Sequence, residues 1–167
     1  MPLKRKTKIV IGLEKYDRID EIAERFKDMH DVEFVNDSEE AYHAIHVFKP
    51  DIAILDYALS KIHPIELYEG IALAHSSVHF VICVTEENYR VAQTIWKQRS
   101  CDFIFKPFFP EQFMSDVNKI VRNVYDMREI NELKLKIDDL KNEINRLNQQ
   151  LKAVLHEKQR EIQILRE

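Results

Sequence analysis

Five short apolar runs recur between residues 9 and 105, and each is separated from the next by a segment with helical spacing. The runs cover residues 9–13, 32–35, 52–55, 78–84 and 103–105. Residues 52–55 and 80–84 are continuously apolar, which is typical of strands buried on both faces of a sheet. Short apolar runs that alternate with helical segments indicate β-α units wound into one parallel sheet. We therefore predict a doubly wound α/β domain with a five-stranded parallel sheet.

The segment between the second and third runs illustrates the predicted helices. A cap falls within residues 36–38, apolar residues follow at helical spacing, and Lys49-Pro50 ends the helix. The other helices are expected from Ile19, from Pro64, from Glu87 to Arg99 and from Pro110. Short right-handed connections would then place helices on both faces of the sheet. In such sheets, functional side chains gather at the carboxyl ends of the strands.

The helix that begins at Pro110 has no sequence reason to end early, because no Gly and no further Pro follow it. Beyond about Arg128 its apolar residues form a heptad pattern, with mostly Ile at position a and mostly Leu at position d. This pattern favours a parallel two-stranded coiled coil and hence a parallel homodimer. The residues predicted to make the dimer contact are Ile130, Leu133, Ile137, Leu140, Ile144, Leu147 and Leu151.

We place the domain boundary where the apolar spacing breaks, which gives a domain over residues 1–127 and a coiled-coil helix over residues 128–167. Later apolar residues continue the heptad only after a four-residue insertion, a stutter that locally unwinds the supercoil. These residues are Leu155, Ile162 and Leu165. The alternative is a long surface helix that folds back on its own domain. We favour the coil, because about 40 helical residues extend roughly 60 Å, well past a small domain.

Composition narrows the class of protein. The chain of 167 residues has 45% apolar residues, enough to fill one core. A net charge of −4 argues against nucleic-acid binding, since binding phosphates requires a concentrated basic surface. No apolar stretch is long enough for a membrane span and no secretory pattern opens the chain, so we expect a cytoplasmic protein without a membrane partner. Cys83 and Cys101 lack metal-ligand spacing, and we expect free thiols.

Three polar residues end three of the predicted strands. Asp56 closes the third strand, Thr85 the fourth and Lys106 the fifth. Each residue alone is typical of a solvated strand end. Because the carboxyl ends of parallel strands meet at one edge of the sheet, their joint occurrence predicts a site that contains a carboxylate, a hydroxyl and an ammonium group.

The segment around Lys106 carries a family resemblance. Residues 103–108 read Phe-Ile-Phe-Lys-Pro-Phe, and Asp56 and Thr85 stand at suitable distances before it. On these residues the chain resembles the CheY-like receiver family over about residues 8–127, and the resemblance implies a flavodoxin-like fold. It also implies that Phe103 is an aromatic switch residue and that the Lys106-Pro107 peptide is cis.

The resemblance implies a phosphorylation mechanism. Asp56 would accept a phosphoryl group from a histidine kinase or a phosphotransfer protein. Lys106 would pair with a phosphoryl oxygen, and Thr85 would donate its hydroxyl to another. Mg²⁺ would offset the charge, held by Glu14, Asp56 and the carbonyl of Ala58.

One departure from the family concerns the metal. The family usually has two acidic residues after the first strand, and this chain has Leu13 and Glu14. Leu13 cannot hold a metal-bound water, although Asp17 could take its place if the loop bends back. We therefore expect Mg²⁺ to bind weakly.

Two functions follow from these residues. The first is a response regulator receiver that relays phosphorylation of Asp56 through a dimeric coiled coil to an output domain or partner. Such a protein is not an enzyme beyond slow self-phosphorylation and self-dephosphorylation. The alternative is a pseudo-receiver that acts as a dimeric interaction scaffold without phosphorylation. A phosphatase of the haloacid dehalogenase kind would need a second Asp where Ala58 stands.

Overall fold

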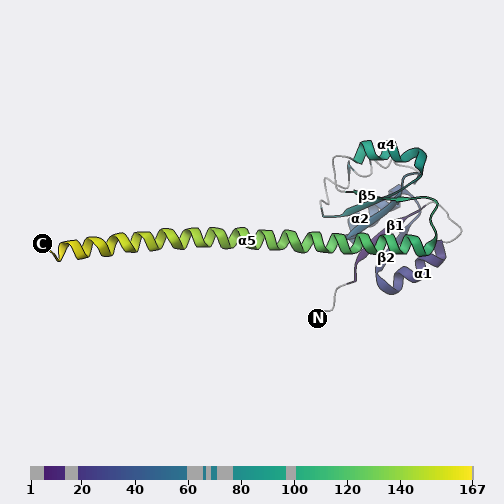
Figure 1. Cartoon of the computed structure of the whole chain (residues 1–167). Coiled ribbons are helices and arrows are strands. Elements are labelled where there is room, and N and C mark those ends of the chain that lie inside the picture. The colour runs from purple at the N-terminus through teal and green to yellow at the C-terminus, as the bar shows by residue number, and fades with distance from the viewer. Residues whose placement is uncertain are drawn as a thin grey trace. The chain divides into compact units, whose positions relative to one another are not determined.

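The structure, a computed structural model, describes residues 6–13, 19–59, 66, 69–70, 77–96 and 101–166. Its five strands form one sheet in which every neighbouring pair is parallel, in the order β2-β1-β3-β4-β5. The strands are β1 (Lys8–Gly12), β2 (Asp31–Val35), β3 (Ile52–Asp56), β4 (His79–Val84) and β5 (Cys101–Phe105). The predicted doubly wound parallel sheet is confirmed (Figure 1).

The described helices are α1 (Ile19–Met29), α2 (Ser38–Phe48), α4 (Glu86–Trp96) and α5 (Pro110–Ile164). Asp37 caps α2, since its side chain accepts hydrogen bonds from the backbone N–H groups of Glu39 and Glu40. Lys49 ends that helix in the left-handed conformation, and its N–H donates to the carbonyl of Ile45. Both ends of α2 agree with the prediction. The helix predicted from Pro64 and the end predicted at Arg99 lie largely outside the described residues.

Helices cover both faces of the sheet. On one face, residues of β1, β3 and β4 pack with apolar residues of α2 and with Ala92 of α4 in a single core cluster. The alternate residues of the same strands are equally buried, and they point to the opposite face. There, Phe26 of α1 contacts Phe113 at the start of α5, with 5.9 Å between the ring centroids. The central strands are thus buried on both sides, as their continuously apolar sequence predicted.

The chain divides into two compact units, residues 1–123 and 124–167, whose junction lies within α5. The boundary predicted after residue 127 lies close to this junction and stays a prediction. The described part of the second unit is helical to Ile164. No helix among the described residues has the length and apolarity to cross a membrane.

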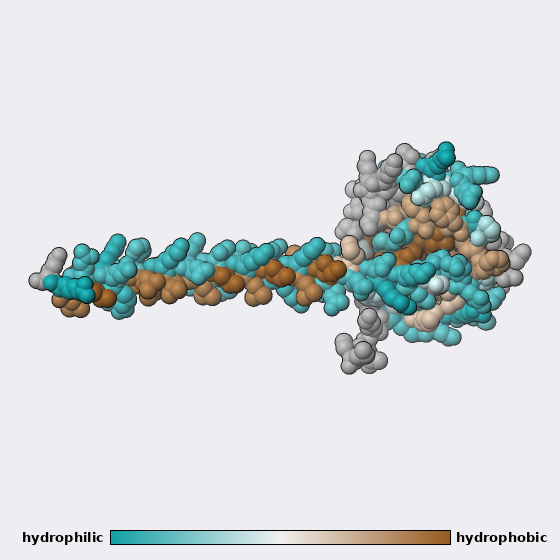
Figure 2. All heavy atoms as spheres, viewed as in Figure 1, coloured by the Kyte–Doolittle hydropathy of each residue, from teal (hydrophilic) through white to brown (hydrophobic). Residues whose placement is uncertain are grey.

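The second unit carries a row of apolar side chains along one side of the helix (Figure 2). In this single chain each of these side chains is between 47% and 62% exposed. We call this row the apolar stripe, and its members are Ile130, Leu133, Ile137, Leu140, Ile144, Leu147 and Leu151. The heptad pattern is therefore present on a continuous helix, while pairing with a second chain stays a prediction.

Candidate functional site

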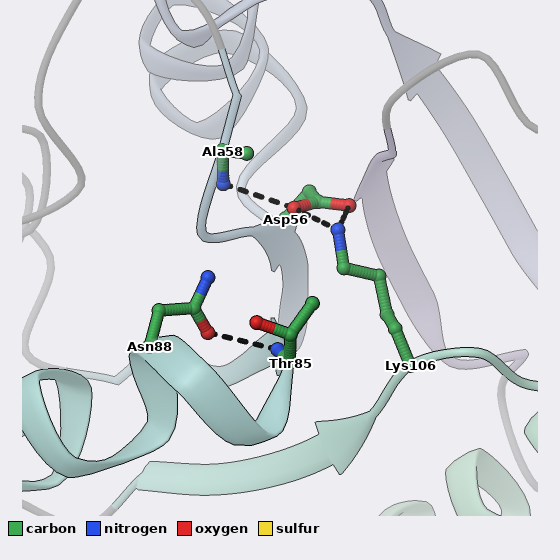
Figure 3. Close-up of polar contacts among 5 residues, drawn as sticks. All are labelled: Asp56, Ala58, Thr85, Asn88 and Lys106. Carbon is green, nitrogen blue, oxygen red and sulfur yellow. Dashed lines mark hydrogen bonds and ion pairs between the residues drawn. The ribbon is translucent and has the colours of Figure 1, made fainter.

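Three strand ends meet at one edge of the sheet. Asp56 is the last residue of β3, while Thr85 directly follows β4 and Lys106 directly follows β5. These strands are neighbours, with Asp56 opposite Cys83 and Val84 opposite Phe105. Figure 3 shows the three side chains around one space, bordered by Ala58 and Asn88. The structure thus brings together the carboxylate, hydroxyl and ammonium groups that the sequence placed at strand ends.

Asp56 and Lys106 form a buried ion pair. The Lys106 ammonium lies 2.8 Å from Oδ1 and 2.7 Å from Oδ2 of Asp56. The Lys106 side chain is 5% exposed and the Asp56 side chain is 0% exposed. The backbone N–H of Ala58 also donates to Oδ1 at 2.9 Å. Because hydrogen bonds between charged groups are strong in a desolvated setting, these contacts fix the orientation of the carboxylate.

The backbone keeps both partners of this pair in place. The Lys106 N–H donates to the carbonyl of Val84 at 2.7 Å, which continues the β4–β5 pairing one residue past the strand. On the other side, the Tyr57 N–H donates to the carbonyl of Cys83, and the chain then turns so that Leu59 N–H reaches the carbonyl of Asp56. The pair is therefore held by the ends of three adjacent strands.

Thr85 forms the N-cap of α4. Its carbonyl accepts the N–H of Tyr89 at 3.0 Å, which is the first bond of the helix. Its own N–H donates to Oδ1 of Asn88 at 2.8 Å. No hydrogen bond joins the Thr85 hydroxyl to a described residue, so in this structure the hydroxyl is not engaged with Asp56.

Phe103, the predicted switch residue, is half-buried on β5. Its ring lies edge-on against Tyr89 of α4, with 5.3 Å between the ring centroids and an interplanar angle of 90°. Tyr89 also contacts Phe105, at 4.8 Å. The Lys106-Pro107 peptide is cis, as the resemblance implied. The role of Phe103 as a switch stays a prediction.

The surroundings of the two cysteines disfavour the reactive thiolate form. Cys83 is fully buried next to Asp56, and both cysteines are free. Burial raises the pKa of the Cys83 thiol, and the charge of Asp56 raises it further. Burial likewise raises the pKa of Cys101 to about 12, with a further contribution from Asp102. Because their pKa values are raised, both thiols stay protonated near neutral pH. Only the thiolate is a strong nucleophile, so neither cysteine is a candidate for nucleophilic chemistry.

The described residues include only part of the predicted magnesium-ligand set. Leu13 is buried at 5% exposure, and it is an apolar residue at a position where the family resemblance implies an acidic one. Glu14 and Asp17 lie outside the described residues. Within the described ranges, no three His, Cys, Asp or Glu side chains are grouped to hold a metal ion. Asp56 and Ala58 are joined by a hydrogen bond, while the predicted metal-ligand set, which also needs Glu14, stays a prediction.

Sequence reasoning missed Asn88 and Tyr89. Asn88 stands three residues after Thr85, at the start of a helix. This spacing is close to a capping box, in which a side chain at the third helical position bonds the backbone N–H of the cap. That spacing could have indicated the Asn88 contact, whereas the Tyr89 contacts depend on the packing of α4 against β5.

Comparisons with known proteins agree with this fold. The profile of the response regulator receiver domain matches residues 16–118, more than half of the chain. A search of curated protein sequences returned no match. Among solved structures, NtrX from Brucella abortus matches with a TM-score of 0.67 and 23% identity over 77% of this chain. This chain spans only 30% of the NtrX chain.

Two smaller proteins match over nearly their whole length. The chemotaxis response regulator CheY4 of Vibrio cholerae matches with a TM-score of 0.60 and 16% identity, over 70% of this chain and 99% of its own. A CheY-like receiver domain protein from Methanospirillum hungatei JF-1 matches with a TM-score of 0.62 and 15% identity, over 74% and 99%. At these identities the structures establish the fold, and the matched profile establishes the family. The chain therefore belongs to the response regulator receiver domain family.

Proposed function

We propose that this chain is a two-component receiver that accepts a phosphoryl group on Asp56 from a histidine kinase or a phosphotransfer protein. The observation that carries the proposal is the buried Asp56–Lys106 pair at the sheet edge, with Thr85 beside it. A carboxylate paired with a lysine, with a hydroxyl nearby, has the nucleophile and the two groups needed to stabilise a transferred phosphoryl group.

The chemistry follows from charge. One oxygen of Asp56 attacks phosphorus, the bond between phosphorus and the donor breaks, and its electron pair leaves with the donor. Lys106 then pairs with a phosphoryl oxygen instead of the carboxylate, since the negative charge has moved outward. Thr85, whose hydroxyl has no described partner, donates to a second phosphoryl oxygen.

A divalent cation would assist this reaction. We propose that Glu14, Asp56 and the carbonyl of Ala58 hold Mg²⁺, which would offset the negative charge of the incoming group. Because Leu13 is a buried apolar residue at the position of a second acidic residue, we expect Mg²⁺ to bind more weakly than in a receiver with both carboxylates.

The apolar stripe supports a dimeric role. An exposed row of Ile and Leu at heptad spacing is unfavourable in water, and its burial against a second copy would remove it from solvent. Ile at a with Leu at d favours two parallel strands. We propose that this coil holds two receivers together and conveys the state of Asp56 to an output domain or partner.

A second candidate function is a pseudo-receiver scaffold, which would use the coil but not the phosphorylation chemistry. The observation that favours it is Leu13, because a receiver that binds Mg²⁺ poorly is phosphorylated poorly. The two candidates make opposite predictions for Asp56.

Beryllofluoride, a mimic of the phosphoryl group, distinguishes the two candidates. The full chain is titrated with beryllofluoride and Mg²⁺ while the fluorescence of Trp96, the only tryptophan in the sequence, is recorded. The receiver function predicts a saturable change that the Asp56→Asn variant lacks. A wild-type chain that does not respond even at high Mg²⁺ would favour the scaffold.

A further inference from the structure

A side chain outside the proposed catalytic set restrains one of its members. Asn88 lies in the first turn of α4, half-buried, and its Oδ1 accepts the backbone N–H of Thr85 at 2.8 Å. Tyr89, the next residue, donates its N–H to the carbonyl of Thr85 at 3.0 Å. The first turn of α4 therefore bonds both the N–H and the carbonyl of Thr85. The bond from Asn88 corresponds to one half of a capping box.

The side chain of Thr85 is not held in the same way. Its hydroxyl makes no hydrogen bond to a described residue, while Asp56 is already bonded by Lys106 and by the N–H of Ala58. Figure 3 shows Asn88 and Thr85 on the side of the space opposite Ala58. The backbone of Thr85 is thus fixed to α4 in a state in which its hydroxyl does not contact the phosphoacceptor.

We propose that Asn88 is a positioning residue that holds Thr85 in its resting position, so that a phosphoryl group on Asp56 must compete with the Asn88–Thr85 hydrogen bond. This inference rests on the proposed phosphorylation of Asp56. If the phosphoryl group draws the Thr85 hydroxyl toward it, the backbone of Thr85 moves with it and the bond to Asn88 is weakened. Asn88 thereby sets how readily the receiver enters its phosphorylated conformation.

The same turn of α4 connects this bond to β5. Tyr89 follows Asn88 and lies against the rings of both Phe103 and Phe105. A displacement of the first turn of α4 therefore changes the packing of these rings, because closely packed side chains do not yield independently. The Asn88–Thr85 bond is in this way placed between the phosphoacceptor and the aromatic residues of the edge strand.

The test compares variants of Asn88 in the full chain. Asn88→Ala and the near-isosteric Asn88→Leu remove the acceptor, whereas Asn88→Gln keeps an amide that can serve at this helix position. The measured quantities are the rate of labelling by acetyl phosphate with Mg²⁺ and the dissociation constant for beryllofluoride. Since a net hydrogen bond is worth a modest free energy, both acceptor-less variants should label about threefold to tenfold faster and bind beryllofluoride tighter by a similar factor. Asn88→Gln should stay close to the wild-type chain.

A second comparison separates positioning from support of α4. If Asn88 acts through the Thr85 hydroxyl, removing Asn88 in a Thr85→Ala background should change neither quantity. Two results would overturn the inference while leaving the proposed function intact. In the first, both acceptor-less variants keep the wild-type labelling rate and beryllofluoride affinity. In the second, both quantities change equally with and without the Thr85 hydroxyl. A wild-type chain that is never labelled would overturn both. Urea unfolding identifies a variant that fails to fold, and the other acceptor-less variant then decides.

Discussion

At the scale of single residues, the chemistry proposed for this chain depends on one buried ion pair. The side chain of Asp56 has no exposed surface and that of Lys106 has almost none. Removing two charges from water is costly, and their attraction compensates for this only while both partners are present. The ion pair therefore keeps the Asp56 carboxylate in a buried position. Because each partner compensates the charge of the other, substitution of either one should be strongly destabilising.

Substitution of Lys106 tests this dependence. Lys106→Ala leaves the Asp56 carboxylate buried without its cation, and we expect the free energy of unfolding to fall by about 3–5 kcal/mol. Urea denaturation at neutral pH measures the change. The control is Lys119→Ala, which breaks an exposed pair with Asp116 and should cost no more than about 1 kcal/mol. Equal losses in the two variants would refute the special status of the buried pair.

His30 is a second residue whose setting has a measurable consequence. It is 8% exposed, its Nε2 lies 3.4 Å from Oδ1 of Asn118, and its Nδ1 has no partner among the described residues. Burial lowers the pKa of His30 from its ordinary value of 6.5, and the charge of Lys6 lowers it further. The bond to Asn118 and the charge of Asp31 act in the opposite direction and are outweighed.

The pH dependence of stability follows from this lowered pKa. The unfolded chain binds a proton at His30 more readily than the folded chain, so stability is full above about pH 6.5 and falls as the pH drops toward the folded pKa. Urea unfolding at about pH 7.5 and about pH 5.5 should therefore show a smaller acid loss for His30→Gln than for the wild-type chain. The exposed His43 provides the control, and His43→Gln should keep the wild-type loss. An unchanged acid loss in His30→Gln would contradict the assignment.

The sequence predicted the charged part of the site better than its surroundings. Asp56, Thr85 and Lys106 could be identified because a polar residue at the end of a buried strand has a defined place at the edge of a parallel sheet. Asn88 ends no strand, so only its spacing after Thr85, close to that of a capping box, could have indicated its contact. The pairing of His79 with Asp102, 2.7 Å apart across β4 and β5, also depends on strand register that no local pattern encodes.

At the scale of elements, the sheet edge depends on a close approach at the end of β1. Gly12 lies opposite Val35 of β2 and Leu55 of β3. A Cβ added at Gly12 would lie 2.9 Å from a methyl of Val35, 3.0 Å from one of Leu59 and 3.2 Å from one of Leu55. Leu59 belongs to the turn that follows Asp56. Glycine at this position therefore allows the turn after Asp56 to pack onto the sheet.

Gly12→Ala tests this close approach. The added methyl group forces three buried side chains to shift, and we expect a loss of about 1–3 kcal/mol in the free energy of unfolding. Gly70→Ala is the matched control, because among the described residues a Cβ there would approach Tyr42 alone, at 3.3 Å. Denaturant titration of both variants gives the comparison. A Gly12→Ala chain as stable as Gly70→Ala would show that the packing at this strand end is looser than described.

The elements themselves followed from the apolar periodicity, with differences at their ends. β5 begins at Cys101, two residues before the predicted start at Phe103, because Cys101 pairs with Phe80 in the β4 register despite the polar Asp102 that follows it. The predicted strand began after the polar Asp102 and therefore left out the first two residues of β5. Strand ends are set by pairing with a neighbour, and this information is absent from a single apolar run.

At the scale of the whole molecule, the apolar stripe is not buried by the packing of the single chain. Its residues are about half exposed, although they are among the most apolar in the chain. Leu135 is also exposed, at 68%, but it stands outside the heptad positions a and d. The helix therefore offers two kinds of exposed leucine, of which only one is expected to be buried in a parallel coil.

Two leucine substitutions test the proposed dimer. Leu140→Asn places a polar group at a d position, whereas Leu135→Asn places the same group on the opposite side of the helix. Sedimentation equilibrium should show a dimer for the wild-type chain and for Leu135→Asn, and a dimer at least tenfold weaker for Leu140→Asn, since burying an unpartnered amide costs roughly 1–3 kcal/mol. The same association constant for both variants would exclude the stripe as the dimer contact.

The central claim is that Asp56 accepts a phosphoryl group, and intact-mass spectrometry tests it most directly. The full chain and its Asp56→Asn variant are incubated with acetyl phosphate over a series of Mg²⁺ concentrations. We predict that the wild-type chain gains the mass of one phosphoryl group, increasingly so as Mg²⁺ rises, and that the variant gains none. A wild-type chain that gains no mass at any Mg²⁺ concentration, or a variant that gains the same mass, would contradict the account.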